Sequence, residues 1–307
     1  MKKIVFISGA TASGKSRFVH ELIDKYFNNA AIISIDSMQV YRYMDIGSAK
    51  PSIEEINKYN YKMVSILDPN TDFNIKYYLD IFKDVINNTD NTPIFGVGGT
   101  GFYIDAVKYG IFYEDNDNQE ASKKIRKELY DRADKYGLES LYFELINIDE
   151  EAAGNIDRFN IRRVVRALEV YYITGKKISE LKKQRKPPVD LDYLSYIIDI
   201  ERETLYNNIN KRVDLMFENG LLNEVKKLID MGINSSHTSM QAIGYKEIYD
   251  YLINNSMSLE NTVELIKKRT RNFAKRQLTW FRREEHRRIT ASDIEAVSDE
   301  IKSFYKS

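Results

Sequence analysis

The sequence predicts an α/β protein, built on a parallel sheet that helices cover on both faces and that carries a helical insertion. Short apolar runs at residues 4–8, 31–35 and 93–97 have the length and composition of buried strands. Amphipathic helical patterns begin after three residues: Lys15, Ile75 and Gly101. Strands that alternate with helices in this way form parallel sheets with both faces covered.

The middle of the chain lacks strand signals. From about Tyr113 to Lys186 it shows a charged helical periodicity, and Pro187 and Pro188 then interrupt the chain. We interpret this stretch as a helical insertion, after which a strand at residues 194–200 returns to the sheet. The predicted parts are a core of residues 1–112, a helical insertion domain of residues 113–190, and a second, mostly helical part of the core, residues 191–307, with a short strand or turn at residues 288–290.

Composition narrows the class of protein. The 46 basic residues balance 46 acidic ones, so any binding of nucleic acid must come from how the charges are arranged. The absence of cysteine excludes disulfides, thiolate metal sites and a cysteine nucleophile, and suits a reducing compartment. No apolar run approaches the roughly 18 residues of a membrane span, and the apolar start ends at Gly9 without a signal-peptide pattern. We therefore expect a cytoplasmic protein without a membrane segment.

A phosphate-binding motif follows the first strand. It matches G-x-x-x-x-G-K-[ST] between a strand and a helix, the context that this motif requires. The glycines let backbone N–H groups turn inward around an anion, Lys15 adds a positive charge, and the helix adds the positive end of its dipole. The Ser16 hydroxyl would ligate a Mg²⁺ ion that bridges phosphate oxygens. The predicted phosphate-binding residues are Gly9, Ala10, Thr11, Ala12, Ser13, Gly14, Lys15 and Ser16. The motif does not choose between a nucleoside triphosphate and another diphosphate.

Two further segments stand where parallel strands should end. Asp36 follows the second strand and could act as a base toward a hydroxyl or an amine, or merely cap a turn. The glycine-rich residues 98–101 open a later helix, and Thr100 among them could donate its hydroxyl to a phosphate oxygen. We expect these residues to face the phosphate loop across the sheet, although a tight turn without a ligand would have the same pattern.

Basic residues recur at helical spacing. Arg158, Arg162 and Arg166 repeat every four residues, opposite an apolar set that would face a core. The same spacing returns near the end of the chain, in Lys267, Arg271 and Lys275, followed by Arg282, Arg283, Arg287 and Arg288. Solvated helix faces paired with glutamates would explain about half of such patterns. Two basic faces beside a phosphate loop favour RNA.

The ordered set of motifs resembles the bacterial tRNA dimethylallyltransferase family, also called isopentenyl-pyrophosphate transferases, over nearly the whole chain. The matching segments are residues 9–16, 36–41, 45–51, 67–69, 98–103, 163–169, 244–247 and 275–282. The resemblance implies that dimethylallyl diphosphate lies on the phosphate loop with Mg²⁺. It implies that the dimethylallyl group passes to the exocyclic N6 amine of the adenosine 3′ of the anticodon in tRNA.

Residue roles follow from the same resemblance. It implies that Asp36 is the general base on the amine, that Thr100 acts beside the diphosphate, and that Arg212 binds the diphosphate. The Gln39 amide also suits an adenine edge by its donor and acceptor pattern, and the adenine must leave its stack to be reached. The residues expected to bind tRNA are Asp36, Ser37, Met38, Gln39 and Thr100 around the flipped adenosine, and Arg126, Arg158, Arg162, Arg163 and Arg166 in the insertion. The expected partners are the anticodon stem-loop of tRNA and dimethylallyl diphosphate, bound by a monomer.

The chain departs from the family pattern at two places. Tyr61 and Lys62 stand near a position where the family often has paired histidines, and Asn160 replaces a common Asp ahead of Arg162. We expect neither departure to touch the chemistry.

Two other functions remain compatible with the residues. A small-molecule or nucleoside kinase would hold ATP on the phosphate loop and use Asp36 to activate a hydroxyl, but a long basic insertion is not the arginine-rich lid that such a kinase needs. A non-catalytic RNA-binding protein could use the loop only to sense a nucleotide.

Overall fold

The computed structural model describes residues 1–90, 92–112, 119–255, 257–282 and 286–307. It separates two compact units, one formed by Met1–Lys108 with Val189–Ser307 and the other by Tyr109–Pro188. The sequence placed the insertion at residues 113–190. Its expected first residue, Tyr113, and the basic residue Arg283 lie outside the described residues.

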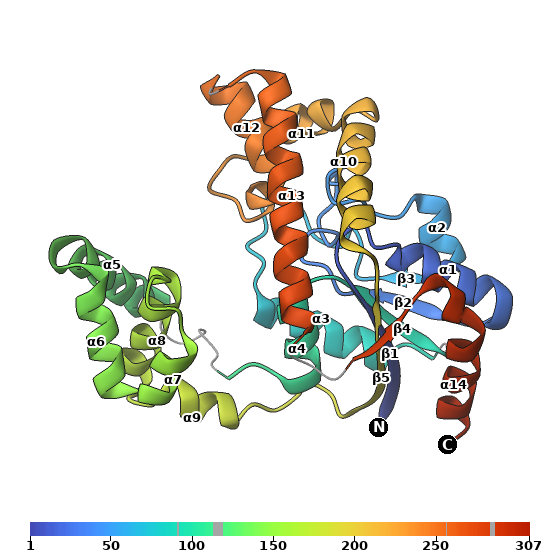
Figure 1. Cartoon of the computed structure of the whole chain (residues 1–307), viewed down its shortest axis with the longest axis horizontal. Coiled ribbons are helices and arrows are strands. Elements are labelled where there is room, and N and C mark those ends of the chain that lie inside the picture. The colour runs from blue at the N-terminus through green and yellow to red at the C-terminus, as the bar shows by residue number, and fades with distance from the viewer. Residues whose placement is uncertain (91, 113–118, 256, 283–285) are drawn as a thin grey trace. The chain divides into compact units, whose positions relative to one another are not determined.

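The first unit is built on a sheet of six strands that are all parallel, in the order β3-β2-β4-β1-β5-β6 (Figure 1). The strands are β1 (Lys2–Ser8), β2 (Ala31–Ser34), β3 (Tyr61–Lys62), β4 (Ile94–Gly98), β5 (Leu191–Ile198) and β6 (Arg287–Ile289). Strands β2 and β4 are buried along their whole length, as is β1 from Ile4 onward, which explains their continuous apolar sequences. The predicted α/β fold with a parallel sheet flanked by helices is confirmed.

Helices surround this sheet. They are α1 (Lys15–Tyr26), α2 (Ile53–Lys58), α3 (Ile75–Asn87), α4 (Gly101–Tyr109), α10 (Arg202–Glu218), α11 (Leu221–Asp230), α12 (Tyr245–Asn254), α13 (Leu259–Phe281) and α14 (Ile294–Lys306), with short 3-10 turns η2 (Ser239–Gln241) and η3 (Ala291–Asp293). Phe18 and Leu22 of α1 pack with Val297 and Ile301 of α14 and with strand side chains in one buried cluster. The first and last long helices of the unit therefore cover the same part of the sheet. Among the described helices, none is long and apolar enough to cross a membrane.

The strand predictions differ from the structure at the edges of the sheet. Strand β3 was not predicted from the sequence, because its two half-buried residues are too few to form a periodic pattern. Strand β5 begins at Leu191, earlier than the expected residues 194–200, because its first residues are only half-buried and do not form an apolar run. The short strand expected at residues 288–290 is β6, which extends the sheet beside β5.

The second unit is helical where it is described. It contains α5 (Gln119–Tyr136), α6 (Leu138–Ile148), α7 (Glu150–Asn155), α8 (Ile161–Thr174) and α9 (Ile178–Lys183). Its own core includes Leu129 of α5, Leu141 and Leu145 of α6, and Val164 and Leu168 of α8. The unit therefore buries an apolar core of its own.

The basic stripe predicted for one helix of this unit is partly wrong. Helix α8 begins at Ile161, capped by the Asn160 side chain, which accepts a hydrogen bond from the N–H of Arg163 at 3.2 Å. Arg158 therefore lies in the turn before the helix, where its guanidinium sits 4.7 Å from the centre of the Phe159 ring. Asn160 thus serves as a helix cap, a role for which Asn and Asp side chains are similarly good.

Arg126 and Arg166 flank a buried carboxylate. The Glu169 side chain is 1% exposed and forms ion pairs with Arg126 at 2.7 Å and with Arg166 at 3.2 Å. Ser122 donates a further hydrogen bond to it. Burial alone would raise the pKa of Glu169, but the hydrogen bonds of Arg126 and Ser122 and the charge of Arg166 outweigh it and hold that pKa below its ordinary value.

Replacing Glu169 by Gln should destabilise the second unit in a pH-dependent way. A carboxylate with a depressed pKa contributes stability above its unfolded pKa and loses it as the pH falls through the folded pKa. Because the two arginines are partly exposed, we expect a loss of about 1–3 kcal/mol at pH 7, less than for a fully buried pair. The difference from wild type should shrink toward pH 3 in urea unfolding. Glu128→Gln, at an exposed position of α5, is the control. A loss of stability that does not depend on pH would mean that Glu169 stabilises the unit by its packing and not by its charge.

Candidate active site

Three loops meet at the carboxyl ends of adjacent strands. The phosphate loop follows β1, Asp36 follows β2, and the glycine-rich residues 98–101 follow β4. A Cβ on Gly98 would overlap the carbonyl of Ile35, and one on Gly99 would lie 2.9 Å from the carbonyl oxygen of Gly9. Glycine is required because these backbones touch. The structure thus brings together the segments that the sequence singled out separately.

The phosphate loop has the geometry of an anion-binding turn. Gly14 has a φ of 91° directly before α1, and Ala12 has a φ of 61°. The loop closes on itself, since the N–H of Ser13 donates to the carbonyl of Ala10 at 3.2 Å and the Lys15 amine donates to the same carbonyl at 2.7 Å. The amine is held inside the loop, where a bound phosphate could replace its carbonyl partner.

Two cations and one carboxylate gather at this loop. Arg212 of α10 donates to the Thr11 hydroxyl at 3.3 Å. Burial and the charge of Arg212 lower the pKa of Lys15 to about 7, against the opposing effect of Asp36. Burial also lowers the pKa of Arg212, again opposed by Asp36. One carboxylate cannot neutralise both cations, so the cluster suits an anion of more than one charge.

Asp36 lies half-buried at the end of β2. One of its oxygens accepts hydrogen bonds from the N–H groups of Met38 at 2.8 Å and of Gln39 at 3.3 Å. This turn fixes the carboxylate, and Ser37, Met38 and Gln39 around it are half-buried. Asp36 therefore does cap this turn, but only one of its two carboxylate oxygens accepts these hydrogen bonds.

Both the oxygen and the nitrogen of the Gln39 amide are hydrogen-bonded to other residues of the chain. Its oxygen accepts from the Ser34 hydroxyl at 2.8 Å, and its nitrogen donates to the carbonyls of Ser48 at 3.4 Å and Ala49 at 3.3 Å. An adenine could use this amide only by displacing those partners. The structure thus gives Gln39 a role in holding residues 48–49, which the sequence did not indicate.

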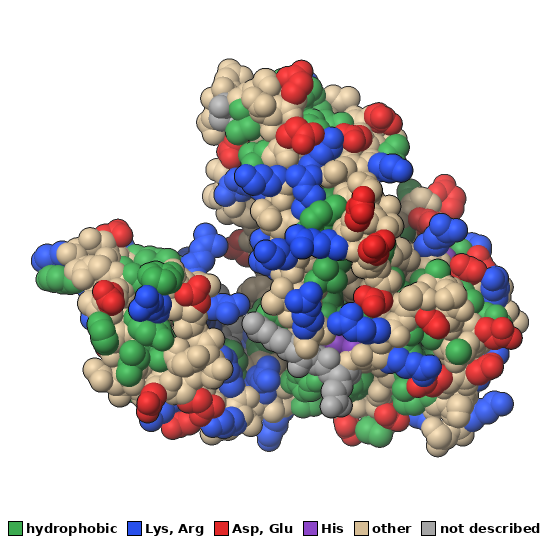
Figure 2. All heavy atoms as spheres, in the orientation of Figure 1, with side chains coloured by type: hydrophobic (Ala, Val, Ile, Leu, Met, Phe, Trp, Pro, Cys, Tyr) green, Lys and Arg blue, Asp and Glu red, His purple; other side chains and the backbone are tan. Residues whose placement is uncertain are grey.

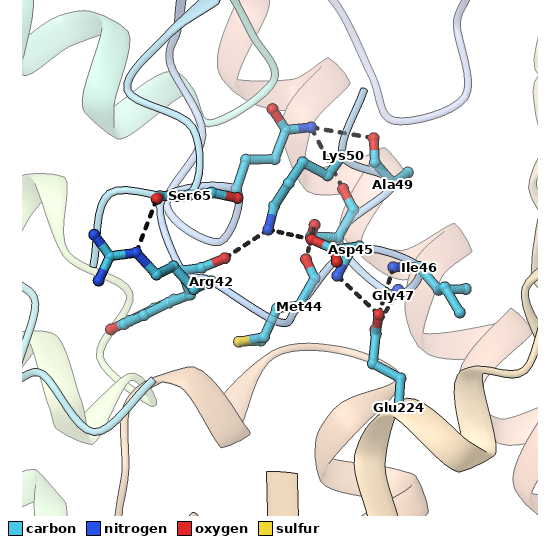
Figure 3. A network of polar contacts seen from close by, with 12 residues as sticks. Arg42, Met44, Asp45, Ile46, Gly47, Ala49, Lys50, Ser65 and Glu224 are labelled. Carbon is cyan, nitrogen blue, oxygen red and sulfur yellow. Dashed lines mark hydrogen bonds and ion pairs between the residues drawn. The ribbon is translucent and has the colours of Figure 1, made fainter. Parts of the chain in front are cut away.

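A polar network fixes the segment after Gln39 (Figure 3). The Glu224 carboxylate of α11 accepts hydrogen bonds from the N–H groups of Asp45 at 2.8 Å, Ile46 at 2.9 Å and Gly47 at 3.1 Å. Lys50 donates to the carbonyl of Tyr41 at 2.6 Å and pairs with Asp45 at 2.5 Å. The motif at residues 45–51 therefore builds a loop around a carboxylate from a distant helix, a contact that no spacing in the sequence indicates.

An aromatic cluster borders Asp36 and was missed by the sequence reasoning. Tyr78 and Tyr103 meet edge to face at 4.7 Å, and Phe73 lies 6.2 Å and 6.4 Å from these two rings. Burial raises the pKa of Tyr103, and the charges of Tyr41 and Asp36 raise it further. Phe73 and Tyr78 are buried, so Tyr103 is the ring of this cluster that could contact a flat or apolar group beside the carboxylate.

Thr100 and Ser16 occupy opposite loops of the site. The carbonyl of Thr100 accepts from the N–H of Ile104 at 3.2 Å, which places Thr100 at the start of α4. Ser16 is exposed in the first turn of α1, and the Tyr61 hydroxyl bonds to it and to His20 Nε2, the latter at 2.8 Å. The expectation that the Tyr61 departure lies away from the chemistry stays a prediction, although Tyr61 contacts the residue predicted to ligate Mg²⁺.

The residues present fit a Mg²⁺ ion held mainly by a substrate. In the part of the chain that the structure describes, no three His, Cys, Asp or Glu side chains form a metal cage. Mg²⁺ commonly takes one or two protein ligands and completes its shell with phosphate oxygens and water. The exposed hydroxyl of Ser16, beside the loop that would hold the phosphates, suits that arrangement.

Basic residues lie exposed in both units. Arg162 and Arg163 are exposed in the first turn of α8. Partial burial and the positive charges of Arg185 and Arg163 lower the pKa of Lys182, so positive charge is concentrated there. In the first unit, Lys and Arg side chains gather over α13 (Figure 2). Lys268, Lys275 and Arg276 of this helix and Arg282 directly after it are exposed.

The second predicted basic stripe, Lys267, Arg271 and Lys275, lies on α13, and part of it is engaged by neighbouring side chains. Lys267 pairs with Asp214 at 2.7 Å and with Glu264 at 3.0 Å, and Arg271 donates to Asn210 at 2.5 Å. Lys275 remains exposed. The alternative of solvated charge pairs therefore applies to Lys267, whereas Arg271 bonds to a neutral amide and keeps its charge.

This fold and site define a P-loop α/β protein with a second, helical unit. The model of the family described as IPP transferase matches residues 39–284. The chain belongs to the IPP transferase family.

Relatives and solved structures agree with that assignment. The chain is 43% identical to a tRNA dimethylallyltransferase of Caldanaerobacter subterraneus subsp. tengcongensis, over 91% of this chain and 89% of the relative. It is similar to the crystal structure of the tRNA isopentenylpyrophosphate transferase of Bacillus halodurans, with a TM-score of 0.69 and 35% identity over 99% and 96% of the two chains. A eukaryotic dimethylallyltransferase captured acting on tRNA has a TM-score of 0.76 and 27% identity, over 96% of this chain and 75% of the other.

Proposed function

We propose that this chain transfers the dimethylallyl group of dimethylallyl diphosphate to the N6 amine of the adenosine 3′ of the anticodon in tRNA. One observation carries the proposal: Lys15 and Arg212 converge on the phosphate loop while Asp36 stands beside them. The cations suit a diphosphate leaving group, and the carboxylate suits an amine nucleophile. Family membership and the names of the relatives support the same reaction.

The chemistry needs charge neutralisation more than covalent catalysis. The C–O bond to the diphosphate breaks, the C–N bond to the adenine forms, and Asp36 accepts the proton that the amine releases. Lys15, Arg212 and the loop N–H groups stabilise the negative charge that grows on the leaving group. Mg²⁺ on Ser16, when bound, supplies further positive charge there. Thr100 donates its hydroxyl from the opposite loop.

An adenine can reach Asp36 only outside its stack. A base in a stacked loop must rotate into a pocket that grips its faces and edge. The half-buried Tyr103 ring, held by the buried Phe73 and Tyr78 behind it, supplies an apolar wall beside Asp36 for such a pocket. All proposed groups come from one chain, so we propose that it acts as a monomer.

One assay separates the candidate functions. Purified protein is incubated with Mg²⁺, labelled dimethylallyl diphosphate, ATP and an unmodified anticodon stem-loop. Prenyl transfer to the RNA supports the proposal, and phosphate transfer from ATP would indicate the kinase. Binding of RNA without either reaction would indicate the non-catalytic protein. A stem-loop with guanosine in place of the target adenosine is the control and should remain unmodified.

Replacing Arg162 and Arg163 by Gln should weaken tRNA binding and flatten its salt dependence. Both side chains are exposed, whereas Arg166 is engaged by Glu169 and would report on stability as well. Each lost phosphate contact should reduce the slope of log K against log salt by about one. Titrations of labelled tRNA at several salt concentrations measure this slope.

Two comparisons make that result specific. Affinity for the free diphosphate substrate should be unchanged, and Lys135→Gln, which removes an exposed charge at the end of α5, should leave the slope unchanged. An unaltered slope in the double variant, with weaker binding of the diphosphate, would make the second unit a lid over a small molecule.

A further inference from the structure

Helix α13 joins two loops of the site through one side chain, Gln277. Its amide oxygen accepts a hydrogen bond from the N–H of Thr11 at 2.8 Å, and its amide nitrogen donates to the carbonyl of Gly99 at 2.7 Å. Thr11 belongs to the phosphate loop, and Gly99 precedes Thr100 in the glycine-rich loop. Gln277 is 6% exposed, so water scarcely competes for these bonds. This residue lies within the motif at residues 275–282 and takes no direct part in the bond-forming chemistry.

The two partners determine which way the amide points. A backbone N–H can only donate and a backbone carbonyl can only accept, so the oxygen must face Thr11 and the nitrogen must face Gly99. A side chain at this position therefore needs one acceptor and one donor at the same reach. Glutamate offers two acceptors, and methionine has a similar length but forms neither bond well.

Packing holds α13 against both loops. One turn before Gln277, Ala274 is fully buried in a cluster with Ala10 of the phosphate loop. Three residues after Gln277, the Trp280 ring occupies the space that a Cβ on Gly101 would need. The amide of Gln277 thus lies between two packing contacts, and it supplies the polar link that fixes the separation of the loops.

We propose that Gln277 is a positioning residue for prenyl transfer, which sets the spacing between the phosphate loop and the loop that carries Thr100. The inference rests on the proposed function and goes beyond it, because it assigns to α13 the alignment of the leaving group. Without the link, each loop can still bind its part of the substrate, but their relative placement relaxes. Chemistry depends more steeply on alignment than binding does, and a shift of 1 Å can lower a rate by about 10²-fold.

Gln277→Met and Gln277→Glu test this role. We expect the turnover of Gln277→Met to fall about 10- to 100-fold, with the affinities for dimethylallyl diphosphate and tRNA within about threefold of wild type. Gln277→Glu should be as slow at pH 8.5, where the carboxylate cannot donate to Gly99. A buried carboxyl that faces a carbonyl has a raised pKa. Lowering the pH toward 6 should therefore restore the donor, and the turnover of this variant relative to wild type should rise.

Controls separate alignment from general damage. The turnover of Gln277→Met relative to wild type should not change with pH, and Asn88→Asp makes the same amide-to-carboxylate exchange at the exposed end of α3. Thermal unfolding checks the fold, and recovery of Gln277→Glu at low pH shows a folded site even if Gln277→Met is unstable. The turnover of the wild type tests the proposed function, whereas the ratios of variant to wild-type turnover test the role of Gln277. Full turnover in Gln277→Met, or a Gln277→Glu ratio that stays flat with pH, would overturn the role of Gln277.

Discussion

Replacing Asp36 by Asn is expected to lower the turnover of prenyl transfer by roughly 10² to 10⁴, the usual contribution of a general base. The amine of adenine becomes acidic only as the new C–N bond forms, so the base acts in the transition state and not in the bound substrates. Affinities for tRNA and for dimethylallyl diphosphate should therefore remain close to wild type. Single-turnover kinetics at saturating substrates measure the effect on chemistry directly.

Asn is the informative substitution because of the turn that Asp36 makes. The Asn side-chain oxygen can still accept the hydrogen bonds that Met38 and Gln39 give to the carboxylate. A purely structural Asp36 would thus be replaced with little loss of turnover. Asp84→Asn, on the exposed side of α3, is the matched control. Weaker binding at an unchanged single-turnover rate would return Asp36 to the turn-capping role.

The sheet and its loops were predictable because their causes are local. Strands β1, β2 and β4 are buried nearly throughout, and this burial requires the apolar runs that identify them. The phosphate loop is equally local, since one strand, one turn and one helix make it. The carboxyl ends of parallel strands meet at one edge, so the sequence alone was enough to place Asp36 and Thr100 near the loop.

The features that the sequence could not reveal depend on partners far along the chain. Glu224 reaches the loop of residues 45–47 from α11, and Gln277 reaches Thr11 from α13. In the sequence, either residue is an ordinary polar position on a helix. Arg126 is an example of the opposite kind. The sequence indicates RNA binding for it, but the structure shows that it forms an ion pair with the buried Glu169. Periodicity identifies which face of a helix is polar, but not which polar groups are already paired.

Replacing Lys15 by Met should weaken the binding of the diphosphate about 10- to 100-fold near pH 6.5, the effect of about 1.5–3 kcal/mol for a charged hydrogen bond. The pH dependence of binding carries a second signature. The pKa of Lys15 is lowered to about 7 by burial and by Arg212, and a bound diphosphate would favour the charged amine. Above pH 7 the wild type must therefore take up a proton on binding, so its affinity should fall as the pH rises.

The stability of the unliganded protein has the matching sign. Between pH 7 and the ordinary lysine pKa of 10.5 the unfolded chain binds more protons than the folded one, so Lys15 disfavours folding less as the pH rises through this window. Lys15→Met removes this dependence, and its unliganded form should be at least as stable as wild type at pH 6. Two measurements apply to wild type, Lys15→Met and the exposed control Lys25→Met. Calorimetric titrations with dimethylallyl diphosphate from pH 6 to 9 measure the pH dependence of binding, and thermal unfolding of the unliganded proteins measures the pH dependence of stability. Because the ionisation of the ligand is common to all three proteins, only the difference between them reports Lys15. Equal affinities for wild type and Lys15→Met at pH 6.5 would place the diphosphate away from this loop.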